Sequence, residues 1–189
     1  EDPSPRVRFF AALALGHLKT PEATAPLLRM LAANADKDAY LRHAAVMGLR
    51  GIGDTSALLA AANDPSPSVR VGIVLALRRL ERPEVASFLN DKQPSIVLET
   101  ARAINDVPIE KAFPELAKLT TREKLDDPTM LRALNANFRL GTAENASAVA
   151  AVAARKDVSD AMRIEALRML ANWTTPRGAD RVIGVWRPL

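Results

Sequence analysis

The chain has 189 residues, of which 48% are hydrophobic, 25% are charged and none is cysteine. That much apolar material supports a buried core, and the missing cysteine excludes disulfides and cysteine-ligated metal sites. The net charge of +4 admits nucleic acid as a partner, but acidic and basic residues balance up to residue 131, as on a solvated surface of mixed sign.

The first predicted element is a helix from Pro5 to about Leu18. Ser4 suits the N-cap, and Pro5 fits the first helical position because its missing N–H is not needed there. Apolar residues then recur with helical spacing at Val7, Ala11, Leu15 and Leu18. We expect this face to be buried, and we expect a second helix over residues 21–33 after a short turn.

The same pattern recurs along the chain. The sequence DPSPRVR at residues 2–8 returns as DPSPSVR at residues 64–70, and both copies lead into a helix-periodic stretch. The shared frame is an Asp, four residues, an apolar residue and an Arg, and it occurs as Asp2 with Arg8, Asp36 with Arg42, Asp64 with Arg70, Asp126 with Arg132, and Asp157 with Arg163. A sixth copy after Asp91 is incomplete, because Val97 stands where the Arg should be. Spacings of 27 to 35 residues predict six helix pairs, starting near residues 2, 36, 64, 91, 126 and 157.

The later pairs depart from the pattern in places. In the fourth pair we expect helices over residues 94–106 and 109–119, followed by a flexible joint at residues 120–127. The fifth pair is out of phase, because Arg139 falls where the first three pairs have leucine. Residues 174–189 contain two prolines and two glycines, so we expect an extended tail or a linker to a following domain there.

A helix pair of about 30 residues cannot bury its apolar stripe alone, so the pairs must stack. This predicts an all-α, right-handed superhelix over residues 1–173. The turn Asp, the apolar residue and Arg near the helix start, and the Ala and Leu on its buried face resemble HEAT repeats. That resemblance implies a ladder in which the turn Asp and helix Arg of the five complete copies connect neighbouring repeats, with an interruption at Val97.

Two shorter stretches carry a narrower resemblance. The sequences ETARAINDVPI at residues 99–109 and ADRVIGVWRPL at residues 179–189 are similar to the HEAT segment of large planctomycete and verrucomicrobial proteins of a membrane-bound-dehydrogenase-like kind. Such proteins often join a propeller to HEAT repeats and a C-terminal c-type haem domain. The resemblance implies a fragment of a larger multidomain bacterial protein from the periplasm or cell envelope. Without cysteine, this chain has no haem attachment motif, and we expect no cofactor in it.

We find no pattern for catalysis or metal binding. His17 and His43 are not spaced as ligands on one helix, and no acidic or cysteine cluster accompanies them. No nucleophile elbow is present, and the glycines of Gly51-Ile52-Gly53 fit a helix end rather than a phosphate loop. We therefore expect that the chain is not an enzyme, although its parent protein could be dehydrogenase-like or haem-binding.

No apolar run reaches the roughly 20 residues of a membrane span, so we expect no membrane insertion.

The function we expect is a non-catalytic scaffold that binds protein or neighbouring domains through its second helices. Candidate contact residues on or near those helices are Arg29, Arg82, Lys111, Lys118 and Arg155. Trp173 and Trp186 join them, because Trp beside Arg is common at interfaces. The alternative is a nucleic-acid-binding solenoid of the DNA-glycosylase type, which the balanced charge of the first 131 residues disfavours. A bilin-lyase type of HEAT protein stays open without residues to support it.

Overall fold

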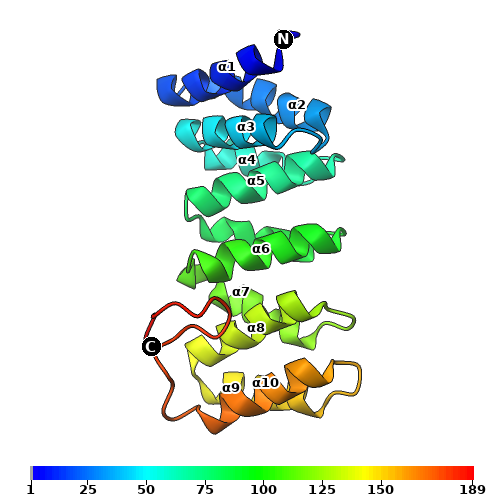
Figure 1. Ribbon diagram of the computed structural model, residues 1–189, viewed down its shortest axis with the longest axis vertical. Helices are drawn as coiled ribbons and strands as arrows, with labels where there is room; N and C mark the ends of the chain where they lie inside the picture. The colour runs from blue at the N-terminus through cyan, green and yellow to red at the C-terminus, as the bar shows by residue number, and fades with distance from the viewer. Residues whose placement is uncertain (1) are drawn as a thin grey trace. The chain divides into compact units, whose positions relative to one another are not determined.

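The computed structural model describes residues 2–189 (Figure 1). Within them all regular secondary structure is helical, and the only extended pairing is an isolated bridge between Ala179 and Trp186. The prediction of an all-α fold of packed helix pairs is therefore confirmed. The helices form two compact units, which divide after Glu99.

The first unit contains three helix pairs. Its elements are α1 (Pro5–Leu18), η1 (Pro21–Ala23), α2 (Thr24–Asn34), α3 (Ala39–Ile52), α4 (Thr55–Ala60), α5 (Pro67–Arg79) and η2 (Pro83–Asn90). The helix α6 (Pro94–Asp106) begins in this unit and ends in the next. Helix α3 packs against both α1 and α5, and α2 contacts α3 and α5.

The second unit contains the remaining pairs. After the end of α6 come η3 (Glu110–Ala112), α7 (Phe113–Lys118), η4 (Leu119–Thr121), α8 (Asp127–Leu140), α9 (Ala143–Ala154) and α10 (Asp160–Ala171). Its core includes Met130, Leu134 and Phe138 of α8, which pack with Val149 and Val152 of α9 and with Ala166 and Met169 of α10. The sixth pair has only its first helix, since residues 174–189 are irregular, as the sequence predicts.

Local sequence explains where the helices begin and end. The Ser4 hydroxyl accepts a hydrogen bond from the backbone N–H of Val7, so α1 begins at Pro5 as predicted. Asp38 and Asp126 cap α3 and α8 in the same way. Gly53 ends α3 at a φ of 74°, a left-handed conformation that glycine adopts without strain.

The other glycine of the Gly51-Ile52-Gly53 segment has a different role from the helix end that we predicted for it. Gly51 lies inside α3, where a Cβ atom would stand 2.5 Å from the backbone oxygen of Gly16. A Cβ atom on Gly16 would in turn stand 2.8 Å from the Cα of Gly48. Three glycines therefore let the backbones of α1 and α3 approach closely.

The apolar face that repeats along the first helices is buried in two pairs and exposed in the first. Leu41, Ala45 and Leu49 of α3, like Val69, Ile73 and Leu77 of α5, are buried. The corresponding residues of α1 were expected to be buried too, but Val7 is 48% exposed and Leu18 is exposed. The physical reason is the stacking itself: α3 and α5 receive the helices of earlier pairs, whereas nothing among the described residues covers this face of α1.

Candidate functional site

The C-terminal segment of residues 174–189 turns back and lies beside α8 (Figure 1). It forms a short antiparallel loop in which the backbone N–H of Asp180 donates to the carbonyl of Val185 at 2.8 Å. The N–H of Arg187 closes the same loop on the carbonyl of Gly178. We call residues 178–187 the terminal hairpin. The tail that the sequence predicts is therefore a docked element of the second unit.

A buried aspartate holds the terminal hairpin together. The Asp180 carboxylate accepts hydrogen bonds from the backbone N–H groups of Val182 and Ile183 at 2.9 and 3.0 Å, and from the Asn135 amide of α8 at 3.0 Å. It also forms an ion pair with Arg187. Burial raises the pKa of Asp180, but these hydrogen bonds outweigh it and hold the pKa below its ordinary value.

Residues of α6 and α8 complete this polar network. Arg187 donates to the backbone carbonyl of Asn105 at 2.9 Å, and Asn135 donates to the Asn105 side-chain oxygen at 2.8 Å. Arg139 donates to the carbonyl of Arg187 at 3.0 Å. Burial, followed by repulsion from Arg187, lowers the pKa of Arg139. Arg139 breaks the apolar phase of α8 because it faces the terminal hairpin, which explains the irregularity of the fifth pair.

The terminal hairpin carries its apolar side chains on the outside. Ile183 and Val185 are exposed, as is Leu189 just beyond the hairpin, and Trp186 is 78% exposed. The Trp186 ring lies over Gly178, where a Cβ atom would stand 2.5 Å from the ring. Polar groups thus face inward and apolar groups face solvent, which is the reverse of ordinary packing and typical of a binding surface.

Trp173 does not belong to that surface. It is half-buried and meets Phe138 edge to face, with ring centroids 5.4 Å apart. The Arg181 guanidinium lies 5.7 Å from the centroid of the same Phe138 ring and pairs with Glu165 at 2.6 Å. The two tryptophans that the sequence groups together therefore have separate roles, one in packing and one at the surface.

A buried ion pair of the first unit connects two neighbouring helix pairs. Arg70 donates to both oxygens of Asp91, at 2.7 and 3.1 Å, and also to the backbone carbonyl of Asp64 at 2.7 Å. Both side chains are buried. Arg70 thus links the turn before its own helix to the turn before α6. Asp91 belongs to the incomplete copy of the frame, whose own Arg is replaced by Val97.

The other predicted ladder residues form different contacts. Arg42 pairs with Asp36 of its own turn at 2.9 Å, at the surface. Arg132 pairs with Asp106, at the end of α6, at 3.0 Å, while Asp126 accepts from the backbone N–H of Thr129.

The last and first copies of the frame also depart from the ladder. Arg163 binds Asp160 and the carbonyl of Ala153, while Asp157 is bound by Arg155. Asp2 accepts from the N–H of Ser4, and the Nε of Arg8 is buried without an acceptor. The ladder implied by the resemblance is thus replaced by local caps and ion pairs at most positions.

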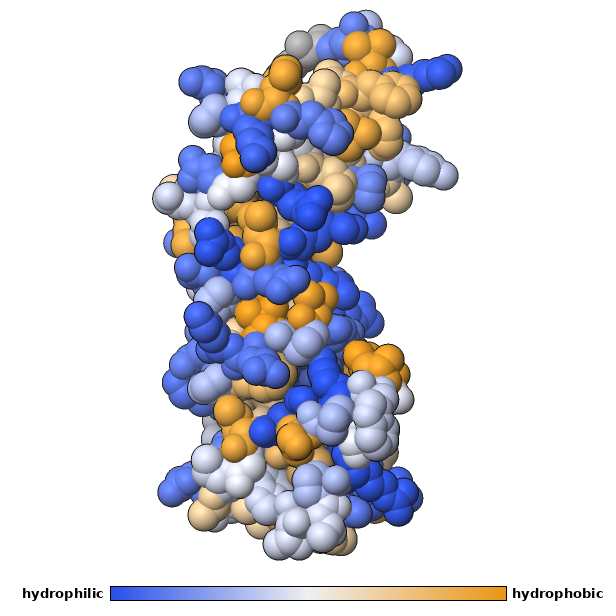
Figure 2. Space-filling view, turned by 90° about the vertical axis from the view of Figure 1, so that its left-hand side faces the viewer, coloured by the Kyte–Doolittle hydropathy of each residue, from blue (hydrophilic) through white to orange (hydrophobic). Residues whose placement is uncertain are grey.

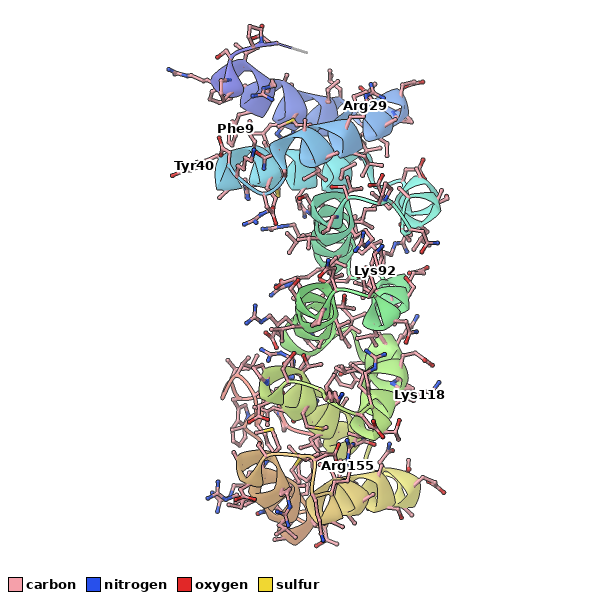
Figure 3. All side chains as sticks on the ribbon, turned by 90° about the vertical axis from the view of Figure 1, so that its right-hand side faces the viewer. Phe9, Arg29, Tyr40, Lys92, Lys118 and Arg155 are labelled. Atoms are coloured by element: carbon pink, nitrogen blue, oxygen red, sulfur yellow. The ribbon has the colours of Figure 1, made fainter. Side chains whose placement is uncertain are left out.

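Two of the predicted contact residues, Arg155 and Lys118, already form ion pairs within their own unit. Arg155 chelates Asp157 through two nitrogens, at 3.0 and 2.6 Å, and also donates to the carbonyls of Thr120 and Arg122. The hydrogen bond to Asp157 raises the pKa of Arg155. The joint expected at residues 120–127 is therefore tied to the end of α9. Lys118 pairs with Glu115 at 2.6 Å at the surface. Figure 3 shows Lys118 pointing outward and Arg155 lying between helices of the second unit.

Arg29, Arg82 and Lys111 are exposed. Arg82 donates to the Thr55 hydroxyl at 3.2 Å. Figure 3 shows Arg29 on the side of the second helices, opposite Phe9 and Tyr40 on the side of the first helices. These cations do not form a common cluster in either unit.

Residues 2–189 show no group of three or more His, Cys, Asp or Glu side chains that could hold a metal ion. His17 and His43 are exposed. The same residues contain no helix with the length and apolar character of a membrane span.

Comparison with protein families extends the sequence observation. A model of HEAT repeats matches residues 1–50 and 31–91. HEAT repeats are therefore detected in residues 1–91. The detected HEAT repeats correspond to α1 to α5 and the segment after α5, in which the frame of Asp and Arg is most regular. The match does not extend to the narrower resemblance to dehydrogenase-like bacterial proteins. A comparison with curated protein sequences gives no significant match.

Among solved structures, the chain is similar to human deoxyhypusine hydroxylase in complex with glycerol. The identity is 18%, the TM-score is 0.37, and the match covers 91% of this chain and 82% of that one. That protein is an enzyme, so the prediction that this chain is not an enzyme was wrong as an exclusion. A likeness at this identity and TM-score assigns no activity, substrate or site residue to the chain.

Proposed function

We propose that the chain is a HEAT-repeat scaffold and that its terminal hairpin is a surface for binding a partner protein. The observation that supports this most directly is the 78% exposure of Trp186 on a loop that a buried aspartate anchors. Tryptophan is a typical interface hot spot, and a loop that is already anchored loses less backbone entropy on binding than a loose one.

The anchoring is what distinguishes the terminal hairpin from a loose tail. Asp180 is 2% exposed, and its carboxylate is fixed from three sides by backbone N–H groups, Asn135 and Arg187. Several buried polar groups form this network. They hold a loop whose own apolar residues remain exposed to solvent. Such an arrangement stabilises the shape of a binding surface rather than a core.

A photo-cross-linking experiment tests the proposal. The amino acid p-benzoylphenylalanine is introduced at position 186 and, as a control, at position 40. Tyr40 is a suitable control because it is an aromatic residue of similar exposure, at 77%, on α3. We expect a discrete cross-linked protein or domain from position 186 and none of the same mass from position 40.

The proposal fails if both positions give the same cross-linked species, or if position 186 gives none while the hairpin remains docked. Docking is checked independently through slow hydrogen exchange of the Val182 and Ile183 amides, which bind Asp180.

We also propose that this scaffold works as one segment of a longer multidomain protein of the bacterial periplasm or cell envelope. The two stretches at residues 99–109 and 179–189 support this through their resemblance to dehydrogenase-like proteins. The reading frame of the whole protein tests it: a flanking propeller or a haem attachment motif is expected, and a cytoplasmic protein without either would contradict it.

A further inference from the structure

The terminal hairpin docks on the second unit through polar groups. Its side chains Ile183, Val185 and Trp186 are exposed. Figure 2, seen from the side on which the C-terminus lies in Figure 1, shows apolar groups at the surface of this unit among hydrophilic ones. Because these side chains are in solvent already, the hydrophobic effect contributes little to docking. The docked state therefore depends on the hydrogen bonds and ion pairs beneath the hairpin.

Those contacts meet at Asp180, whose side chain is 0% exposed. The backbone N–H groups of Val182 and Ile183 donate to its Oδ1, while the Asn135 amide and the Arg187 guanidinium donate to its Oδ2. Each of these groups is an N–H donor, and none of them offers a lone pair at that contact. The site thus fits an ionised carboxylate and provides no acceptor among these groups for a proton on Asp180.

Charge makes the same requirement. Arg187 and Arg139 of α8 both face the Oδ2 of Asp180, and their side chains are 15% and 8% exposed. Neutralising Asp180 leaves these two guanidinium groups close together without the anion between them, which is costly for buried charges. The other charged groups of this network are Glu110, which attracts Arg139, Asp106 at the end of α6, which binds Arg132, and Glu165 of α10, which binds Arg181.

The connection to α10 allows the hairpin to leave as one piece. Residues 174–177 are exposed. The backbone hydrogen bonds from Asp180 to Val185 and from Arg187 to Gly178 lie within the hairpin. Helices α8, α9 and α10 share an apolar core of their own. Undocking therefore breaks contacts between the hairpin and the helices without unfolding a helix.

We propose that the terminal hairpin is a pH-sensitive element of the fold: protonation of Asp180 releases it from α8 and from the end of α6, while the helices of the second unit stay folded. Burial raises the pKa of the docked Asp180, but its hydrogen bonds bring that pKa below the ordinary value. The stabilisation of the docked state is therefore present above about pH 3.9, the ordinary pKa of aspartate, and is lost as the pH falls through the lower pKa of the docked carboxyl.

Release also changes the surface that carries Trp186, because the ring lies over Gly178 only while the hairpin keeps its shape. Acid then removes the candidate binding surface. The release itself does not require that the hairpin bind a partner, so it can be tested on the isolated chain.

The test measures distances between spin labels. Because the chain has no cysteine, labels go only where cysteines are introduced. The pair Ile183→Cys with Ala143→Cys reports the position of the hairpin relative to α9. The pair Ala161→Cys with Ala143→Cys reports the packing of α10 on α9 and is the control, and all three positions are exposed.

We expect the hairpin pair to change from one narrow distance distribution at neutral pH to a broad one below about pH 4. The ratio of docked to released molecules should fall by up to about tenfold per pH unit, the limit for release coupled to one proton. The helix pair should keep a narrow distribution over the same range.

Two variants assign the response to one carboxylate. Asp180→Asn is neutral at every pH, so we expect its ratio of docked to released molecules to be lower than that of the unaltered hairpin by about tenfold or more at neutral pH, without a further change in acid. Glu165→Gln is the matched control, because Glu165 is the other carboxylate that binds the hairpin, through Arg181. We expect it to keep the acid response.

The proposal is overturned if both label pairs broaden together, since acid then unfolds the whole unit. It is also overturned if the hairpin pair stays narrow down to about pH 2.5, well below the ordinary pKa of aspartate. An acid response that persists in Asp180→Asn, or that disappears in Glu165→Gln, contradicts the role of Asp180. The pH profile of the unaltered network needs neither variant, so it decides the question even if Asp180→Asn fails to fold.

Discussion

Arg70 is the residue whose contacts most strongly connect two neighbouring turns. Its guanidinium binds the Asp91 carboxylate with two nitrogens and the carbonyl of Asp64 with a third. The side chains of Arg70 and Asp91 are only 4% and 5% exposed, so water does not screen the pair. A surface pair such as Arg42 with Asp36 has the same chemistry but contributes little, because water competes for both groups.

Substitution of Arg70 by Met is expected to destabilise the chain severely. The loss of the guanidinium leaves the Asp91 carboxylate buried without its cation, which typically costs about 3–5 kcal/mol. Urea unfolding followed by circular dichroism measures this, with Arg42→Met as the surface control, for which about 0–1 kcal/mol is expected. Equal losses in the two variants would show that burial of the pair is unimportant.

Asp91 also makes the stability of the fold depend on pH. Burial raises the pKa of Asp91, but the hydrogen bonds from Arg70 and Gln93 and the charge of Arg70 lower it overall. A carboxyl group with a lowered pKa stabilises the fold above its unfolded pKa of about 3.9, and that stabilisation disappears as the pH falls through the folded pKa. The difference in free energy of unfolding between the wild-type chain and Asp91→Asn should therefore narrow as the pH falls below about 4. A difference that stays constant between neutral pH and the acid range contradicts this.

At the scale of elements, the contact between α1 and α3 depends on glycine. Gly51→Ala would place a methyl group 2.5 Å from the backbone oxygen of Gly16, which forces the two helices apart. We expect a net destabilisation of about 1–3 kcal/mol, since overpacking outweighs the better helix propensity of alanine. Thermal unfolding measures it, and Ser56→Ala at an exposed position of α4 is the control.

The terminal hairpin is the second element that depends on a single residue. Asp180→Ala removes the acceptor for the amides of Val182 and Ile183 and leaves Arg187 and Arg139 close together without a carboxylate. We expect hydrogen exchange of these amides to accelerate by about a hundredfold or more, which corresponds to a loss of about 3 kcal/mol in local stability. Asp160→Ala, in an exposed pair with Arg163, should leave them protected.

At the scale of the whole molecule, most of the arginines that give the chain its excess of positive charge already have hydrogen-bond partners within the protein. Acidic and basic residues balance up to residue 131, so the surplus lies in the last 58 residues. In that part most of the arginines donate to a carboxylate or a carbonyl of the protein: Arg132, Arg139, Arg155, Arg163, Arg181 and Arg187. Cations held in this way are poorly placed to replace counterions along a phosphate backbone.

Duplex DNA is therefore expected to bind weakly and with little salt dependence. Fluorescence anisotropy at about 50 mM and 200 mM salt measures this, because each phosphate contact adds about −0.9 to the slope of log K against log salt concentration. A slope of several units would favour the nucleic-acid-binding alternative over the scaffold.

Helix boundaries were the most predictable feature of this chain. Ser4, Pro5 and the apolar spacing of α1 predict its start and end, and the frame of Asp and Arg predicts the number of first helices. The partners of the arginines were not predictable, because the sequence does not show whether a turn Asp faces its own helix, caps a backbone N–H or reaches the next repeat. Arg42, Arg70 and Arg132 share one motif position and bind three differently placed carboxylates.

The sequence by itself determined the all-α repeat, because helical periodicity and N-caps are local properties that a short segment already contains. Only the tertiary structure decided which faces are covered. The close contact at Gly51 and the burial of Asp180 each arise from residues far apart in the chain. Arg139 illustrates the difference: in the sequence it interrupts an apolar stripe, and in the fold it binds a segment 48 residues later.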